Sequence, residues 1–187
     1  MLESFRYTYD ELDENTKYTD ASSYGYAYAK LLSESIRVTD DLFPKIKVKI
    51  DQTISSLNLE DNFEFFITSD NTNTNAYCIS KNNCSAIIVM NSRLVDILSE
   101  DELMFVVGHE IGHHTFKHSN NLPDISKDTL SDLKYLHLDL QRKMELSCDR
   151  IGLLSVKDFN IAAKAIIKMV SGLGDKHIES NYKKYLS

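Results

Sequence analysis

Apolar residues recur every three or four positions along several stretches of the chain, a spacing typical of helices with one buried face. Residues 23–43 follow this spacing until Pro44 interrupts it. Residues 45–57 are expected to resume as a helix, although their first six positions alternate like a strand. A further helix is expected to begin after Ser99, which completes a capping box with Glu102 in "SEDE".

Helical spacing stops at residues 120–126, which include Pro123, and then resumes twice. A long amphipathic helix is expected next, with one stripe formed by Leu130, Leu133, His137, Leu140, Met144, Cys148 and Ile151. The last predicted helix, "FNIAAKAIIKMVSGLG" (159–174), should stop at its glycines.

A strand-like region lies in the middle of the chain. Residues 62–68, "NFEFFIT", are aromatic and β-branched, and the turn-forming "SDNTNTN" follows them. "AYCIS" (76–80) and "SAIIVMN" (85–91) flank "KNNC", which predicts a β-hairpin. Three short strands are too few for a separate domain. With no repeat or linker, the sequence predicts one α+β domain over residues 23–187, and the polar residues 1–22 stay unassigned.

Composition narrows the class of protein. The 187 residues are 42% hydrophobic and 26% charged, which is enough for one sizeable core. A net charge of −7 without a basic stripe argues against nucleic-acid binding. No segment approaches the about 18 apolar residues of a membrane span, and the acidic start does not look like a signal peptide, so a cytoplasmic protein is expected. Three cysteines, Cys78, Cys84 and Cys148, are expected to be free thiols.

The stretch "FVVGHEIGHHTFKH" (105–118) carries the candidate chemistry. His109 and His113 are four residues apart, so on a helix they lie about 40° apart and one turn above one another. Both imidazoles can then reach one metal ion, for which zinc is the default. Glu110 lies on the same flank but off that line, where it can face a metal-bound water as a general base. This is the H-E-x-x-H pattern of zinc-binding helices. The alternative interpretation is an ordinary amphipathic helix that exposes its His and Glu side chains to solvent.

An open zinc site needs a third protein ligand. Candidates are Glu145, Asp149, His137, Cys148 and His177. Glu145 and Asp149 are four apart in "ELSCD", so one carboxylate can bind the metal while the other orients a ligand histidine. Glu145 adjoins the apolar stripe, where burial without a partner would be costly, and this favours it as the ligand. Cys148 is expected to be a small core side chain.

The remaining histidines are expected to have ordinary roles. His118 lies about 140° around the helix from His113, off the metal face, and is expected to act as a cation near the helix C-terminus. His114 is expected to face solvent, although it is close to Glu110 in helical spacing. His137, on the apolar stripe, is expected to be a buried core histidine.

The segments "LSEDELMFVVGHEIGHHTFKH" and "ELSCDRIGL" together resemble the M48 peptidases, gluzincins that include the membrane-bound CAAX prenyl protease and bacterial stress peptidases. "NAYCIS" is similar to the Asn-Ala-aromatic segment ahead of that family's active helix, so the resemblance covers roughly residues 62–155. It implies that one zinc ion per chain is bound by His109, His113 and Glu145. It also implies that Glu110 is catalytic and that Asp149 supports a ligand. His118 matches a histidine often found at that position.

The family's membrane-bound members carry transmembrane helices, which this sequence does not show, so it resembles more the soluble single-domain members, the minigluzincins. It lacks a His-Pro motif common near the end of the family's domain. The resemblance implies a zincin-like domain, with a small sheet packed on an active-site helix and a glutamate-bearing helix facing it. The expected function is a zinc metalloendopeptidase that cleaves a peptide or protein substrate, with Glu110 as general base. The alternative is a zinc-bound, non-catalytic regulator or interaction module, for which Glu110 would be unnecessary.

Overall fold

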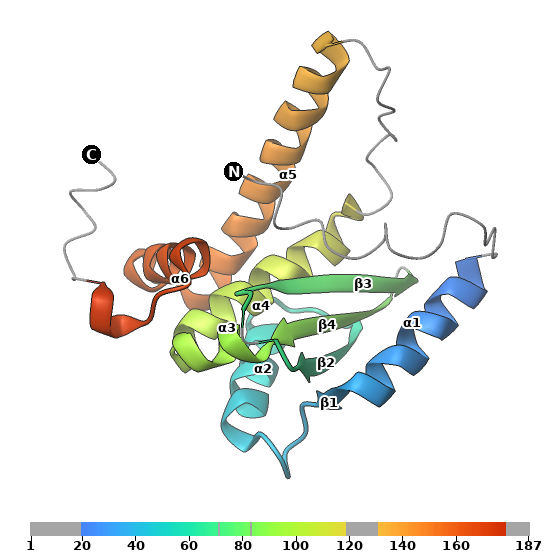
Figure 1. Ribbon diagram of the computed structural model, residues 1–187, viewed down its shortest axis with the longest axis vertical. Helices are drawn as coiled ribbons and strands as arrows, with labels where there is room; N and C mark the ends of the chain where they lie inside the picture. Colours follow the sequence, from blue (N-terminus) through green and yellow to red (C-terminus); the bar gives the residue numbers. More distant parts are fainter. Residues whose placement is uncertain (1–19, 71, 83, 119–130, 179–187) are drawn as a thin grey trace.

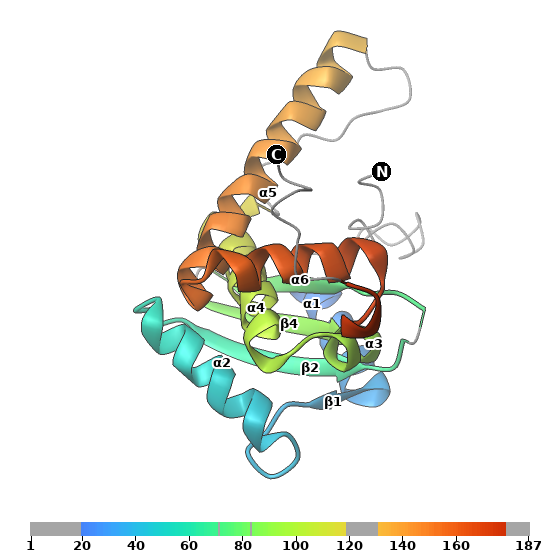
Figure 2. The ribbon, with the colours of Figure 1, turned by 90° about the vertical axis from the view of Figure 1, so that its left-hand side faces the viewer.

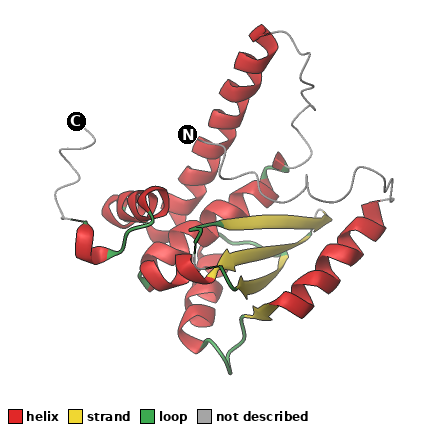
Figure 3. Cartoon of the chain, viewed as in Figure 1, coloured by secondary structure: helices red, strands yellow, loops and turns green. Residues whose placement is uncertain are grey.

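The computed structural model describes residues 20–70, 72–82, 84–118 and 131–178, and within these ranges the chain forms a four-stranded sheet and six α-helices (Figures 1 and 3). The elements are α1 (Asp20–Glu34), β1 (Ser35–Arg37), α2 (Pro44–Ser56), β2 (Asn62–Thr68), β3 (Ala76–Asn82), β4 (Ser85–Asn91), α3 (Ser92–Ile97), α4 (Glu100–Thr115), α5 (Ser131–Val156), α6 (Phe159–Ser171) and the short 3₁₀ helix η3 (Asp175–His177). The α+β class is therefore confirmed. The predicted break at residues 120–126 lies outside the described residues.

The sheet has the strand order β1-β2-β4-β3. The predicted hairpin is confirmed, because β3 and β4 pair antiparallel with Cys78 opposite Ile88. β4 also pairs in parallel with β2, which makes it a central strand and explains why its residues are almost all buried. The helix predicted over residues 23–43 was too long. It ends at Glu34, and the next three residues pair with β2 as the short strand β1.

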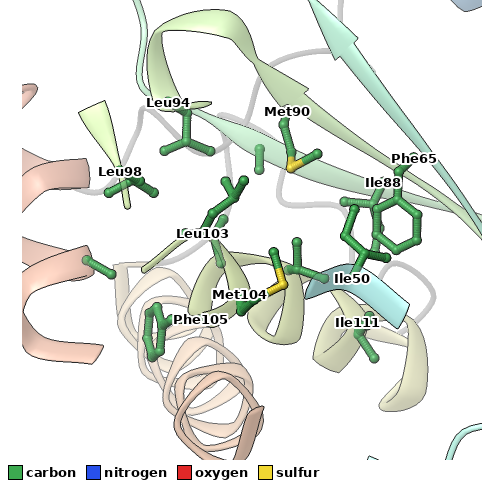
Figure 4. Close-up of a cluster of buried hydrophobic side chains, with 14 of the residues drawn as sticks. Ile50, Phe65, Ile88, Met90, Leu94, Leu98, Leu103, Met104, Phe105 and Ile111 are labelled. Carbon is green, nitrogen blue, oxygen red and sulfur yellow. The ribbon is translucent and has the colours of Figure 1, made fainter. Parts of the chain in front are cut away.

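Alternating residues of the central strands serve two hydrophobic clusters on opposite faces of the sheet. On one face Phe65, Ile88 and Met90 pack against residues of α2, α3 and α4, including Ile50, Leu94, Leu103 and Ile111 (Figure 4). On the other face, Phe66, Ile87 and Val89 pack against Leu31 of α1. The sheet thus has α1 on one side and α4 on the other, and α4 is enclosed by the sheet, α2, α5 and α6 (Figures 1 and 2).

The start of α4 is fixed by the predicted capping box and by a buried ion pair. The Ser99 hydroxyl accepts a hydrogen bond from the Glu102 backbone N–H, and the Glu102 carboxylate accepts one from the Ser99 backbone N–H. Lys168 of α6 is fully buried and donates to the same carboxylate at 2.6 Å and to the Ile97 carbonyl at 3.0 Å. α6 therefore holds the first turn of α4 in place.

The 26-residue α5 packs on the body only through its C-terminal part, and its N-terminal part projects from the molecule (Figures 1 and 2). Met144 and Cys148 of the predicted apolar stripe are buried, but Leu133 is 51% and Leu140 39% exposed. From Leu133 onward the stripe was correctly placed on a helix but is buried over only part of its length, and Leu130 lies outside the described residues. Within the described ranges, none of the helices has the length and apolar character needed to cross a membrane.

Candidate metal centre

Helices α4 and α5 approach each other closely because glycines line their contact. A Cβ atom on Gly112 would lie 3.1 Å from the Cα atom of Cys148. A Cβ atom on Gly152 would lie only 2.7 Å from the carbonyl oxygen of Phe105. The two backbones therefore meet with almost no side chain between them. Gly108 directly precedes His109 and Gly112 directly precedes His113, so the segment that carries the candidate ligands also makes this close contact.

The close approach brings the predicted site residues of both helices together. The Nε2 atoms of His109 and His113 are 3.2 Å apart. One carboxylate oxygen of Glu145, on α5, lies 3.3 Å from His109 Nε2 and 3.8 Å from His113 Nε2. Asp149, one turn further along α5, lies 3.0 Å from His109 Nδ1. All four residues thus meet at one point between α4 and α5.

This geometry fits a tetrahedral zinc ion. Zinc binds imidazole nitrogen and carboxylate oxygen at about 2.0–2.2 Å, which separates ligand atoms by roughly 3.3–3.6 Å in a tetrahedron. The three separations among His109, His113 and Glu145 are 3.2, 3.3 and 3.8 Å. A neutral His109 donates its Nδ1–H to Asp149, which leaves the Nε2 lone pair directed toward the other two ligand atoms. The donor set and its spacing therefore suit zinc.

The carboxylates make this point attractive to positive charge. Burial lowers the pKa of His109, but hydrogen bonds with Asp149 and Glu145 outweigh burial and raise the pKa to about 10. Burial and the charge on His109 lower the pKa of His113 to about 4. The histidines in turn hold the pKa of Glu145 below its usual value despite its burial. A cation held among the three side chains would replace the proton on His109 and keep the same attraction to the carboxylates.

Glu110 lies beside this cluster and is 3% exposed. Burial raises the pKa of its carboxyl group to about 7, while the positive charge of His109 lowers it by less. The pKa of the Cys78 thiol on β3 is also raised, mainly by burial and in second place by the negative charge of Glu110. Glu110 is therefore close to β3 as well as to the histidines. A carboxyl group with a pKa near neutrality is suited to taking and releasing a proton.

Cys148 is a second candidate for the third ligand. It is completely buried against Gly112, and its Sγ atom and one nitrogen from each of His109 and His113 all lie within 4.8 Å of one another. Burial raises the pKa of the thiol, and the nearby negative charge of Glu145 adds to the effect. A metal ligand must be the thiolate, so this environment favours the carboxylate over the thiol.

His114 was predicted to face solvent, and the structure shows that this was wrong. It is 4% exposed, its Nδ1 atom lies 2.8 Å from the Ser80 hydroxyl of β3, and its ring meets Phe63 edge to face. It therefore links α4 to the edge of the sheet. His137 is buried, as predicted, and His177 is exposed in η3.

His118 was predicted to lie off the metal face as a cation near the helix end, but it is buried beside His113. The helical angle misplaced it because α4 ends at Thr115, before His118 is reached. Lys117 then adopts a left-handed conformation with φ 56°, which reverses the chain and returns His118 to the cluster. The prediction extended helical geometry beyond the end of the helix, and the sequence contains no glycine there to signal the reversal.

Comparison with known proteins adds an independent observation. The family described as "Peptidase family M48" matches residues 40–133, which include the histidines and glutamate of α4. A curated relative, the plastoglobule-localized metallopeptidase 48, chloroplastic, of Arabidopsis thaliana, is 26% identical over 111 residues. That alignment covers 52% of this chain and 32% of the relative, so the chain matches about a third of the relative's length. Glu145 and Asp149 lie beyond the residues that the family matches.

Proposed function

The chain belongs to peptidase family M48, and from this membership and the site geometry we propose that it is a zinc-dependent metalloendopeptidase with a zincin-like domain. The observation that carries the proposal is the convergence of His109, His113 and Glu145 at separations that suit tetrahedral zinc, with Glu110 buried beside them. One zinc ion per chain is proposed. The family implies a peptide or protein substrate.

His109, His113 and Glu145 would hold the zinc ion. Bound there, zinc would act as a Lewis acid toward the scissile carbonyl and would lower the pKa of a nearby water. Glu110 takes a proton from the attacking water and later delivers it to the leaving amine. Burial, which raises the pKa of this carboxyl group in the metal-free chain, favours its holding a proton between the two steps. Asp149 accepts the Nδ1–H of His109 and holds that ring in its orientation.

The edge of the sheet supports a way to bind the substrate. Among the described strands, β3 pairs only with β4, so its other edge offers backbone N–H and C=O groups to an extended peptide. Cys78 of β3 lies near Glu110, and Ser80 of β3 is tied to His114 of α4. A peptide paired along β3 would therefore run past the general base. The contact between Ser80 and His114 fixes the position of the strand relative to the active helix.

A direct test is cleavage of casein by the purified chain. Cleavage should be measurable, stop when a chelator removes the metal, and return when zinc is added. The alternative, a zinc-bound regulator without turnover, predicts stoichiometric zinc but no cleavage of casein or of a broad peptide library by any preparation. A protein that takes up no zinc after incubation would refute both functions.

The choice between Glu145 and Cys148 as third ligand can be tested with cobalt(II) in place of zinc. A cobalt–thiolate bond gives an intense charge-transfer absorption in the near ultraviolet, and a carboxylate does not. We expect no such band in the wild type, retained metal binding in Cys148→Ala, and a large loss of affinity in Glu145→Ala. A thiolate band that disappears in Cys148→Ala would assign the thiol as the ligand instead.

A further inference from the structure

Each of the two candidate ligand histidines has a polar side chain within hydrogen-bond distance of its Nδ1 atom, the ring nitrogen that points away from the proposed metal. His109 has Asp149 at 3.0 Å from its Nδ1 atom. Among the described residues no carboxylate contacts the corresponding atom of His113, but the Nδ1 atom of His118 lies 3.2 Å from it. A histidine that binds a metal through Nε2 almost always donates its other N–H to an acceptor. The structure supplies His113 with a second histidine as that acceptor.

Several contacts hold His118 in this position. After the reversal at Lys117, whose backbone N–H donates to the His114 carbonyl at 3.0 Å, the chain directs His118 back toward α4. The His118 ring stacks on Phe116, with centroids 5.5 Å apart and planes at 25°, and meets the His113 ring edge-on at 5.2 Å. His118 as a whole is 8% exposed, so water has little access to the contact.

Only one placement of the ring protons of His113 and His118 leaves His113 free to bind a metal through Nε2 and keeps the hydrogen bond between the two rings. If His113 presents its Nε2 lone pair to a metal, its Nδ1 atom must carry the proton and donate it. His118 Nδ1 must then accept, which requires a neutral His118 protonated on Nε2, because a doubly protonated ring has no acceptor. The Sγ atom of the buried Cys148 also lies 3.4 Å from this His118 nitrogen.

We propose that His118 is a positioning residue that accepts the Nδ1–H of His113 and so fixes the tautomer and ring orientation in which His113 binds the metal. This inference rests on the proposed zinc site but concerns a residue outside the ligand set. In this arrangement His118 does for His113 what Asp149 does for His109. The reversal at Lys117 then has a role in the site, since it returns the acceptor to the helix that carries the ligand.

The test compares zinc affinity, by competition with a chromophoric chelator, in three variants. His118→Leu keeps apolar volume but removes the acceptor, and zinc binding should weaken about 10- to 100-fold. His118→Asn places an amide oxygen close to the position of Nδ1, and should restore most of the affinity. His177→Leu makes the same chemical change at an exposed position and should bind zinc like the wild type. Melting curves of the metal-free proteins separate these effects from loss of folding.

A second measurement depends on no variant. In long-range proton–nitrogen NMR spectra of the zinc-loaded wild type, His113 should carry its proton on Nδ1 and His118 should carry its proton on Nε2. A His118 proton on Nδ1 would overturn the inference, as would wild-type zinc affinity in His118→Leu. Equal losses in the leucine and asparagine variants would also overturn it, because packing and not acceptance would then be responsible. A wild type that binds no zinc would instead remove the proposed function and this inference with it.

Discussion

We expect Gly152→Ala to destabilise the protein, because the new side chain would lie in the close contact between α4 and α5. This is the opposite of the usual effect of alanine, which favours helices. In an unhindered helix the change should stabilise by up to about 1 kcal/mol. Here the new Cβ atom would lie 2.7 Å from the Phe105 carbonyl oxygen and 2.9 Å from two atoms of its ring. Carbon contacts are optimal at about 3.5–4.0 Å, so α5 must move away by several tenths of an ångström. Overpacking of this kind costs about 1–3 kcal/mol, which outweighs the helical gain.

The same movement should reach the proposed metal site, because Glu145 and Asp149 lie within two turns of Gly152 on α5. We expect Gly152→Ala to lower the free energy of unfolding by about 1–2 kcal/mol. Zinc affinity should fall by about 10-fold or more as the His109–Asp149 contact lengthens.

Urea unfolding of the metal-free protein and chelator competition measure these two effects. The matched control is Gly25→Ala in α1, where a Cβ atom meets nothing within 4 Å. This control should leave zinc affinity unchanged and raise stability slightly. A Gly152→Ala protein as stable as the control, with wild-type zinc affinity, would refute the close helix contact as the feature that positions the site.

Three further predictions concern charge. Lys168→Met should destabilise by about 3–5 kcal/mol in urea unfolding, because it leaves the buried Glu102 carboxylate without its 2.6 Å partner; a loss below 1 kcal/mol would contradict this. Zinc uptake at neutral pH should release at least one proton, because the pKa of His109 is about 10, and affinity should therefore fall as pH is lowered; calorimetry in buffers of different ionisation enthalpy counts the protons. Glu145→Ala should lose more zinc affinity than Asp149→Ala, and the reverse order would mean that the ligand assignment is wrong.

The local features of the sequence predicted the elements that carry the site. Ser99 and Glu102 fixed the start of α4, and the spacing of His109 and His113 put both rings on one side of it. The turn residues of "KNNC" predicted the hairpin that forms the edge of the sheet. These predictions succeeded because caps, turns and helical spacing depend on neighbours within a few residues.

The features that the sequence did not predict depend on distant parts of the chain. β1 is only three residues long and exists because it pairs with β2, some thirty residues later, so its own pattern does not distinguish it from the end of a helix. The burial of His114 depends on Ser80 and Phe63 from two different strands. The position of His118 depends on where α4 stops and on the backbone at Lys117, which helical spacing does not describe.

Peptide cleavage by Glu110→Gln at matched zinc occupancy tests whether Glu110 is the general base of a zinc peptidase. Glutamine keeps the shape and hydrogen-bonding reach of glutamate but does not take up the proton of the attacking water. Glu100→Gln, the same change in the exposed first turn of α4, is the control and should cleave like the wild type. Glu110→Gln should retain zinc and melt no earlier than the wild type, while turnover should fall by roughly 10²–10⁴-fold. Undiminished cleavage by the zinc-loaded Glu110→Gln protein would contradict it.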